Sequence, residues 1–235
     1  MKKLIRRSRS ALKSINYGRA KRIFCLSMQR TGTTSVGRFF RDFGFRWAGW
    51  PTDENNDWSG SWYEGDYERI FSSTDFTAAN AFEDSPWFLP GFYKVLFHRF
   101  PKAKFILFTR DPDAWFQSMV RHSGGDIIGR SRIHCKIYRR ELEYLELLHS
   151  NEIDENAENQ IHSNKTMKLA DYAVHYKNIY RLHNTEVMDF FRRHSPESLH
   201  TGMLEDPDKW QKLGEFLGVD VPKDYTCHEN VSNGK

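Results

Sequence analysis

The sequence predicts an α/β fold, a three-layer sandwich in which helices flank a central parallel sheet. Two apolar runs, Ile23 to Leu26 and Phe105 to Phe108, have the length and composition of buried parallel strands. After each run comes a short turn and then apolar residues at helical spacing, which is the strand–turn–helix order of such folds. With 235 residues, 39% of them hydrophobic, the chain is long enough to bury a core. We expect a basic arm over residues 1–20 and one domain over residues 21–235.

The loop between the first strand and the first helix, Ser27 to Ser35, has the composition of an anion-binding site. It combines a glycine, an arginine and several hydroxyl side chains, and the helix that follows has an apolar face with Val36, Phe39, Phe40 and Phe43. Backbone N–H groups and the positive end of a helix dipole bind phosphate-type anions at such a position. The residues predicted to form the site are Arg30, Thr31, Gly32, Thr33, Thr34 and Ser35. The alternative is a Ser/Thr-rich turn that only caps the helix.

This loop departs from the P-loop that binds nucleoside triphosphates. The pattern GxxxxGK[ST] requires a lysine directly after its last glycine and then a hydroxyl residue that binds Mg²⁺. Here Gly32 is followed by Thr33 and Thr34, and the cation, Arg30, precedes the glycine. The sequence therefore disfavours ATP hydrolysis, and a P-loop-type kinase is kept only as an alternative function.

After the first helix, the segment from Phe45 to Trp50 predicts a second strand. The next segment, Pro51 to Gly65, is rich in Asp, Asn, Gly and Ser without any period, which is typical of a long surface loop. Its aromatic residues either line a pocket for a sugar or an aromatic ring or pin the loop to the core. These residues are Trp58, Trp62 and Tyr63.

Residues 76–86 predict a short strand that ends in two carboxylates, Glu83 and Asp84, just before Pro86. An acidic residue at the carboxyl end of a strand lies at the crevice where open α/β sheets bind ligands, on the same edge as the loop after the first strand. Asp84 is therefore the candidate general base, and Glu83 is its competitor. The alternative for Asp84 is a residue that starts a turn or caps a helix.

The strand Phe105 to Phe108 ends at Thr109, and we expect Asp111 to cap a helix that has Pro112 near its first position. Arg110 then projects from the strand end toward the same crevice, and Ser118 lies about two helical turns from the cap. The two side chains are predicted to share one anion. The alternative for Arg110 is a structural ion pair with Asp111 or another nearby acid.

The remaining segments predict scaffold. Helices are expected over Ile127 to Leu148 and Met167 to Arg193, with a polar connection, Asn151 to Lys165, between them. A last strand, Ser198 to Met203, precedes a helix that we expect Asp206-Pro207 to cap and Gly218 to end. The histidines show no metal-ligand spacing, so the sequence predicts no metal site.

Three of these segments carry a resemblance to the sulfotransferases with a P-loop-like fold. Arg30-Thr31-Gly32-Thr33-Thr34-Ser35 resembles their phosphosulfate-binding loop, and Arg110-Asp111-Pro112 with Trp115 and Ser118 resembles the segment that holds the 3′-phosphate of the donor. Asp84-Ser85-Pro86, followed by Phe92-Tyr93-Lys94, is similar to their Asp-x-Pro segment with the catalytic base, although its spacer is slightly longer. The resemblance extends from about residue 21 to about residue 231.

The resemblance implies transfer of a sulfuryl group from 3′-phosphoadenosine-5′-phosphosulfate (PAPS) to a hydroxyl or amine of a glycan or small-molecule acceptor, without a metal. It implies that Asp84 deprotonates the acceptor and that Arg30 stabilises charge on the leaving group. His228, Asn230 and Val231 match the family's C-terminal loop over the nucleotide. A non-catalytic module that binds nucleotide or sulfated glycan on the same fold is the other alternative.

Charge is concentrated at the N-terminus. Nine of the 35 Lys and Arg residues fall in the first 22 positions without one acid, which leaves 26 basic against 31 acidic residues in the remainder. This arm either contacts an anionic membrane surface, guides an anionic glycan, binds nucleic acid non-specifically or is a solvated tail. We expect no specific nucleic-acid partner, and the sequence indicates no oligomeric state.

Cysteine usage favours a reducing compartment, because Cys25, Cys135 and Cys227 are odd in number and widely spaced. No apolar run approaches the roughly 20 residues that span a bilayer. The N-terminus also lacks the apolar core of a signal peptide. We therefore expect a cytoplasmic protein.

Overall fold

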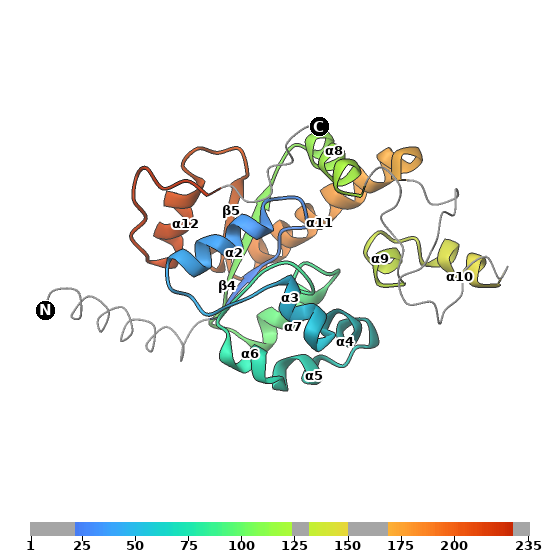
Figure 1. Ribbon diagram of the computed structural model, residues 1–235, viewed down its shortest axis with the longest axis horizontal. Coiled ribbons are helices and arrows are strands. Elements are labelled where there is room, and N and C mark those ends of the chain that lie inside the picture. Colours follow the sequence, from blue (N-terminus) through green and yellow to red (C-terminus); the bar gives the residue numbers. More distant parts are fainter. Residues whose placement is uncertain (1–21, 124–131, 150–168, 228–235) are drawn as a thin grey trace, which may run out of the picture. The chain divides into compact units, whose positions relative to one another are not determined.

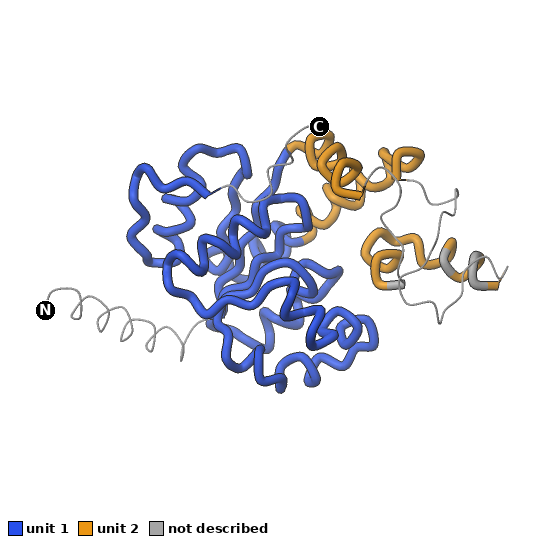
Figure 2. The backbone as a smooth tube through the Cα atoms, in the orientation of Figure 1, with its two compact units in different colours: residues 1–110, 187–235 blue, residues 111–186 orange. Residues whose placement is uncertain are grey.

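The computed structural model describes residues 22–123, 132–149 and 169–227 (Figure 1). The chain divides into two compact units, one formed by residues 1–110 and 187–235 and the other by residues 111–186 (Figure 2). The predicted arm, residues 1–20, and the predicted polar connection, Asn151 to Lys165, lie outside the described residues.

The described part of the first unit is built on a five-stranded sheet in which every pair of neighbours is parallel. The strand order is β2-β3-β1-β4-β5. The strands are β1 (Ile23–Cys25), β2 (Trp47–Ala48), β3 (Ala81–Phe82), β4 (Lys104–Thr109) and β5 (Leu199–Met203). Because all strands run the same way, the segments that leave β1, β3, β4 and β5 start from one edge of the sheet. The edge therefore collects the loop, the two carboxylates and Arg110.

Helices cover both faces of this sheet, as the alternation of strand side chains requires. On one face, α2 (Thr33–Asp42) and α12 (Lys209–Leu217) bury a core that includes Cys25, Ile106 and Trp210 (Figure 1). On the other face, the ring of Phe24 lies 5.0 Å from that of Phe82 and 5.2 Å from that of Trp87. The short helices α5 (Tyr67–Ser72), α6 (Thr74–Ala78) and α7 (Phe92–Arg99) supply further rings to this second core. The predicted three-layer α/β fold is thus confirmed.

The prediction of a surface loop over Pro51 to Gly65 is wrong. The segment forms two helices, α3 (Trp50–Asn56) and α4 (Trp58–Glu64), joined at Asp57, which adopts the left-handed conformation with φ 52°. The polar residues that suggested a loop act as helix-end residues: the Asp53 carboxylate accepts hydrogen bonds from the backbone N–H (2.7 Å) and hydroxyl (2.6 Å) of Ser59. Asp and Asn favour helix ends and turns alike, so composition alone does not separate the two.

Other boundaries differ from prediction by a few residues. The strands predicted over Phe45 to Trp50 and over 76–86 are two residues long each, as β2 and β3. The second is shorter than predicted because Phe76 to Ala78 belong to α6, and Ser73 caps the N-terminus of that helix. Helix α12 starts at Lys209 after Asp208, rather than directly at the predicted Asp206-Pro207 cap. Gly218 ends α12 in the left-handed conformation, as predicted.

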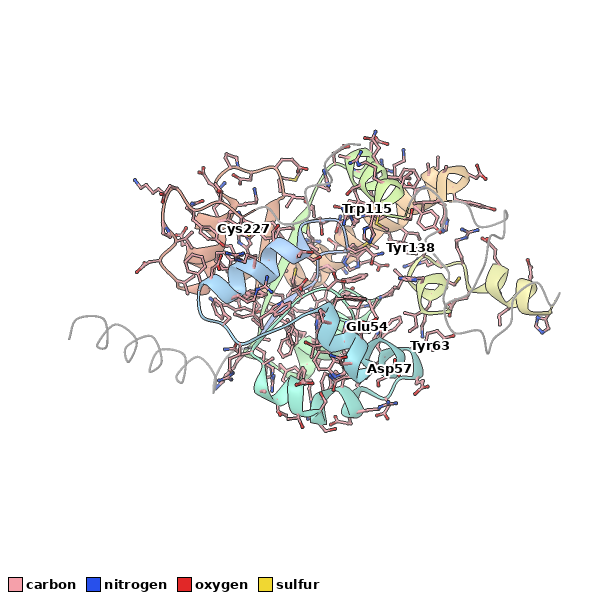
Figure 3. All side chains as sticks on the ribbon, viewed as in Figure 1. Glu54, Asp57, Tyr63, Trp115, Tyr138 and Cys227 are labelled. Carbon is pink, nitrogen blue, oxygen red and sulfur yellow. The ribbon has the colours of Figure 1, made fainter. Side chains whose placement is uncertain are left out.

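The second unit is helical, with α8 (Pro112–His122), α9 (Arg132–Ile137), α10 (Glu141–His149), the 3₁₀ turn η2 (Leu169–Tyr172) and most of α11 (Ala173–His194). As predicted, Asp111 caps α8 by accepting the N–H groups of Asp113 and Ala114. Trp115, labelled in Figure 3, stacks on Tyr180 with ring centres 4.4 Å apart. The single helix predicted over Ile127 to Leu148 is divided at Arg139, whose φ is 56°. In the described ranges, no helix is both long and apolar enough to cross a bilayer.

Candidate functional site

The loop after β1 approaches the following helix through two residues with positive φ, Arg30 (68°) and Gly32 (81°). The N–H of Thr31 donates to the carbonyl of Met28 at 3.2 Å, which closes the turn. The φ of Gly32 favours glycine, and a Cβ at this position would lie 2.5 Å from Cδ1 of Leu204, so it would displace that side chain. An arginine in this conformation is uncommon, and such strain is concentrated at functional sites.

The N-terminus of α2 has no side-chain cap, as is also the case for α3, α4, α7 and α12. Helices α5, α6 and α8 each receive a side-chain cap, from Asp66, Ser73 and Asp111 respectively. The N-cap residue of α2 is Gly32, which offers no side-chain cap, and the first turn of α2 contains no acidic residue. The positive end of this helix dipole is therefore not neutralised by a carboxylate of the helix itself.

Asp84 lies beside this helix N-terminus. The hydroxyl of Thr33, the first residue of α2, donates to Oδ2 of Asp84 at 3.2 Å, and the N–H of Ser85 donates to Oδ1 at 2.9 Å. Asp84 itself has a φ of 66° and is half-buried. The structure thus brings together two residues that are 51 positions apart and that belong to separate predicted motifs.

Glu83 is directed elsewhere. Its side chain is buried, with 4% exposed, and Oε1 accepts the indole N–H of Trp47 at 3.2 Å. Its other oxygen, Oε2, has no hydrogen-bond partner among the described residues. Burial, and next the charge of Asp84, raise the pKa of Glu83 well above its usual range. Glu83 therefore keeps its proton to a higher pH than an exposed glutamate does.

Glu83→Gln is expected to make the folded chain more stable, by an amount that grows with pH. The raised pKa means that the folded state binds more protons than the unfolded state above the unfolded value of about 4.3, so wild-type stability falls by about 1.4 kcal/mol per pH unit until the folded pKa is passed. Thermal unfolding of both proteins at pH 5, 7 and 9 measures this difference. Glu215→Gln, on the exposed side of α12, controls for the loss of one charge. A difference that shrinks with rising pH would contradict the burial argument.

Arg110 also reaches the loop. Its Nη1 donates to the backbone carbonyl of Arg30 at 3.3 Å, and its Nε lies 3.4 Å from Oε1 of Glu205. The side chain is 20% exposed. The partner in the ion pair is therefore Glu205, not the adjacent Asp111. Sequence reasoning missed Glu205, although it follows the end of β5, and the same edge rule that selected Arg110 would have selected it.

Other predicted residues are placed less directly at the loop. Thr34 is exposed, and Ser35 is buried with its carbonyl 3.6 Å from Sγ of Cys227, which Figure 3 labels beside α2. Ser118 is buried on α8 in the second unit, and its share in an anion site stays a prediction. The three predicted C-terminal residues, His228, Asn230 and Val231, lie outside the described residues.

The aromatic residues of the former loop segment belong to the core. Trp58 and Trp62 are 1% and 3% exposed, and the indole N–H of Trp58 donates to the hydroxyl of Ser73 at 3.1 Å. Of the two alternatives, they therefore pin the segment to the core and do not line a pocket. Tyr63 is half-buried. No three His, Cys, Asp or Glu side chains in the described part of the chain come together as metal ligands would.

Comparison with the curated proteins finds no match. The family model described as the sulfotransferase domain matches residues 22–234, which is nearly the whole chain and the range in which the loop, Asp84 and Arg110 lie. This extent of match, over a parallel sheet with an anion-type loop after its first strand, shows that the chain belongs to the sulfotransferase domain family.

Proposed function

We propose that this protein transfers a sulfuryl group from PAPS to a hydroxyl or amine of a glycan or small-molecule acceptor. The observation that carries the proposal is the 3.2 Å hydrogen bond between Thr33 and Asp84, because it holds a candidate base at the loop that would bind the donor. Membership of the sulfotransferase domain family supports the sulfuryl transfer.

The donor would bind along the loop. In this proposal Thr33, Thr34 and Ser35 bind the 5′-phosphate at the N-terminus of α2, and Thr31 and Gly32 belong to the same donor-binding loop. Arg110, which already contacts the loop at the carbonyl of Arg30, would bind the 3′-phosphate, and the share of Ser118 in this contact stays a prediction.

The proposed reaction is an in-line displacement at sulfur. Asp84 takes the proton of the acceptor O–H or N–H, and the acceptor atom forms the new bond to sulfur. The bond between sulfur and the bridging oxygen breaks, and this oxygen leaves on 3′-phosphoadenosine-5′-phosphate (PAP). Arg30 and the loop amides stabilise the negative charge that develops on this oxygen. A sulfuryl group carries less negative charge than a phosphoryl group, so we propose that arginine and the helix dipole suffice without a metal.

Calorimetric titration of the metal-free protein with PAP and then with ATP tests the donor site. We expect tight binding of PAP, weak binding of ATP, and a loss of about tenfold or more in PAP affinity in Arg110→Ala. Thermal unfolding checks that the variant is folded. Equal affinity for PAP and ATP, or Mg²⁺-dependent ATP turnover, would favour the kinase alternative. PAP affinity without product formation from any acceptor would favour the non-catalytic alternative.

We propose the cytoplasm as the location. All three cysteines fall in the described ranges, are buried and form no disulfide, which agrees with a reducing compartment. A role of the basic arm on membranes or glycans remains a proposal that deletion of residues 1–20 would test by liposome and glycan binding.

A further inference from the structure

The segment that leaves β5 lies directly on the anion-type loop. The N–H of Leu204 donates to the carbonyl of Thr109 at 2.7 Å, so pairing with β4 continues past the last strand residue. The side chain of Leu204 then covers Gly32. Glu205, the next residue, is therefore held at the loop by its backbone.

Glu205 is the acid that faces Arg110. The following acid, Asp206, is engaged within its own segment: it accepts the N–H of Asp208 at 2.9 Å and forms an ion pair with Lys212 at 2.5 Å. Arg110 accordingly contacts the loop on one side, through the carbonyl of Arg30, and Glu205 on the other. The carboxylate of Glu205 thus lies where a phosphate that binds the guanidinium of Arg110 would also lie.

The ion pair between Glu205 and Arg110 is weak and can be displaced by a stronger anion. The Glu205 side chain is 51% exposed and its oxygen is 3.4 Å from Nε, without the two parallel hydrogen bonds of a forked pair. Ion pairs with this much solvent contribute little free energy. A phosphate monoester carries up to two charges and three acceptor oxygens, so it competes for the same guanidinium.

We propose that Glu205 is an internal anion that pairs with Arg110 and competes with the 3′-phosphate of the donor and of the product for this guanidinium. This inference rests on the proposed function. Glu205 lowers the affinity for every ligand that places a phosphate at Arg110, and it therefore shortens the lifetime of bound PAP after transfer. A ligand without a 3′-phosphate does not reach Arg110 and is indifferent to Glu205.

The test compares PAP with adenosine 5′-monophosphate, which lacks the 3′-phosphate, in calorimetric titrations of the wild type and Glu205→Gln. We expect PAP to bind the variant about three- to tenfold more tightly and the monophosphate to bind both proteins equally. Glu215→Gln removes one negative charge from the exposed side of α12 and is expected to change neither affinity. Stopped-flow displacement of PAP should show the gain mainly as slower dissociation.

Each outcome separates the two proposals. If PAP binds both proteins with equal affinity, or binds Glu205→Gln more weakly, the competition is overturned while the donor site stands. If the variant gains affinity equally for PAP and the monophosphate, the gain comes from the general change of charge, and the proposed competition is again overturned. If neither protein binds PAP, the proposed function fails and this inference fails with it.

Discussion

Asp84→Asn is expected to lower the rate of sulfuryl transfer by about 10²- to 10⁴-fold while PAP still binds. The amide oxygen of asparagine can accept the N–H of Ser85, its amide N–H can donate to the hydroxyl oxygen of Thr33, and asparagine, like aspartate, tolerates the left-handed backbone conformation, here with φ 66°. It cannot accept the proton of the acceptor. The change therefore removes the proposed base and leaves the surrounding fold in place. The rate is measured in single turnovers with PAPS and the best acceptor from a screen of phenols, sugars and amines.

Two matched variants accompany Asp84→Asn. Asp57→Asn makes the same change at an exposed aspartate with positive φ (52°) in the same unit, labelled in Figure 3, and should leave the rate unchanged. Glu83→Gln tests the competing carboxyl and should keep the rate within about threefold, because Glu83 is buried against Trp47. A large loss in Glu83→Gln together with an active Asp84→Asn would assign the base to Glu83 instead.

Arg30→Ala is expected to lower the rate of transfer by about 10²- to 10³-fold, the usual effect of removing one donor that stabilises developing charge. Alanine retains the backbone carbonyl that accepts from Arg110, so the second phosphate contact stays in place. Alanine also has a Cβ, so the cost of φ 68° stays similar to that of arginine. The variant thus isolates the guanidinium. Single-turnover rates and PAP titrations measure the two effects separately.

Arg38→Ala is the control for this variant. Arg38 lies on the exposed side of α2, where it forms an ion pair with Asp42 at 2.9 Å, and its loss changes the net charge by the same amount. We expect no more than about a twofold change in rate. If Arg30→Ala weakens PAP binding but transfers at the wild-type rate once saturated, Arg30 contributes binding alone and its role in charge stabilisation is wrong.

The fold class and the residues near the candidate site were predictable from local sequence patterns. The rule that parallel strands end at the same edge of a sheet connects these patterns. Apolar runs such as Phe105 to Phe108 select buried parallel strands, and parallel strands direct their carboxyl ends to a single edge. Residues that follow those ends, such as Asp84 and Arg110, are therefore expected near the loop even before any distance is known, and both contact it. Glycine and hydroxyl residues before a helix also predicted the loop and the start of α2, while the binding of an anion there stays a prediction.

Tertiary structure alone decided the remaining assignments. Asp and Asn at positions 53–57 lie in α3 and at its junction with α4 here, but the same residue types form turns elsewhere, so only packing of Trp58 and Trp62 into the core selects helix. Glu83 and Asp84 are adjacent in sequence and chemically alike, yet one is buried against Trp47 and the other faces Thr33. Periodicity carries no information about which of two neighbouring side chains is desolvated, because desolvation depends on elements distant in the sequence.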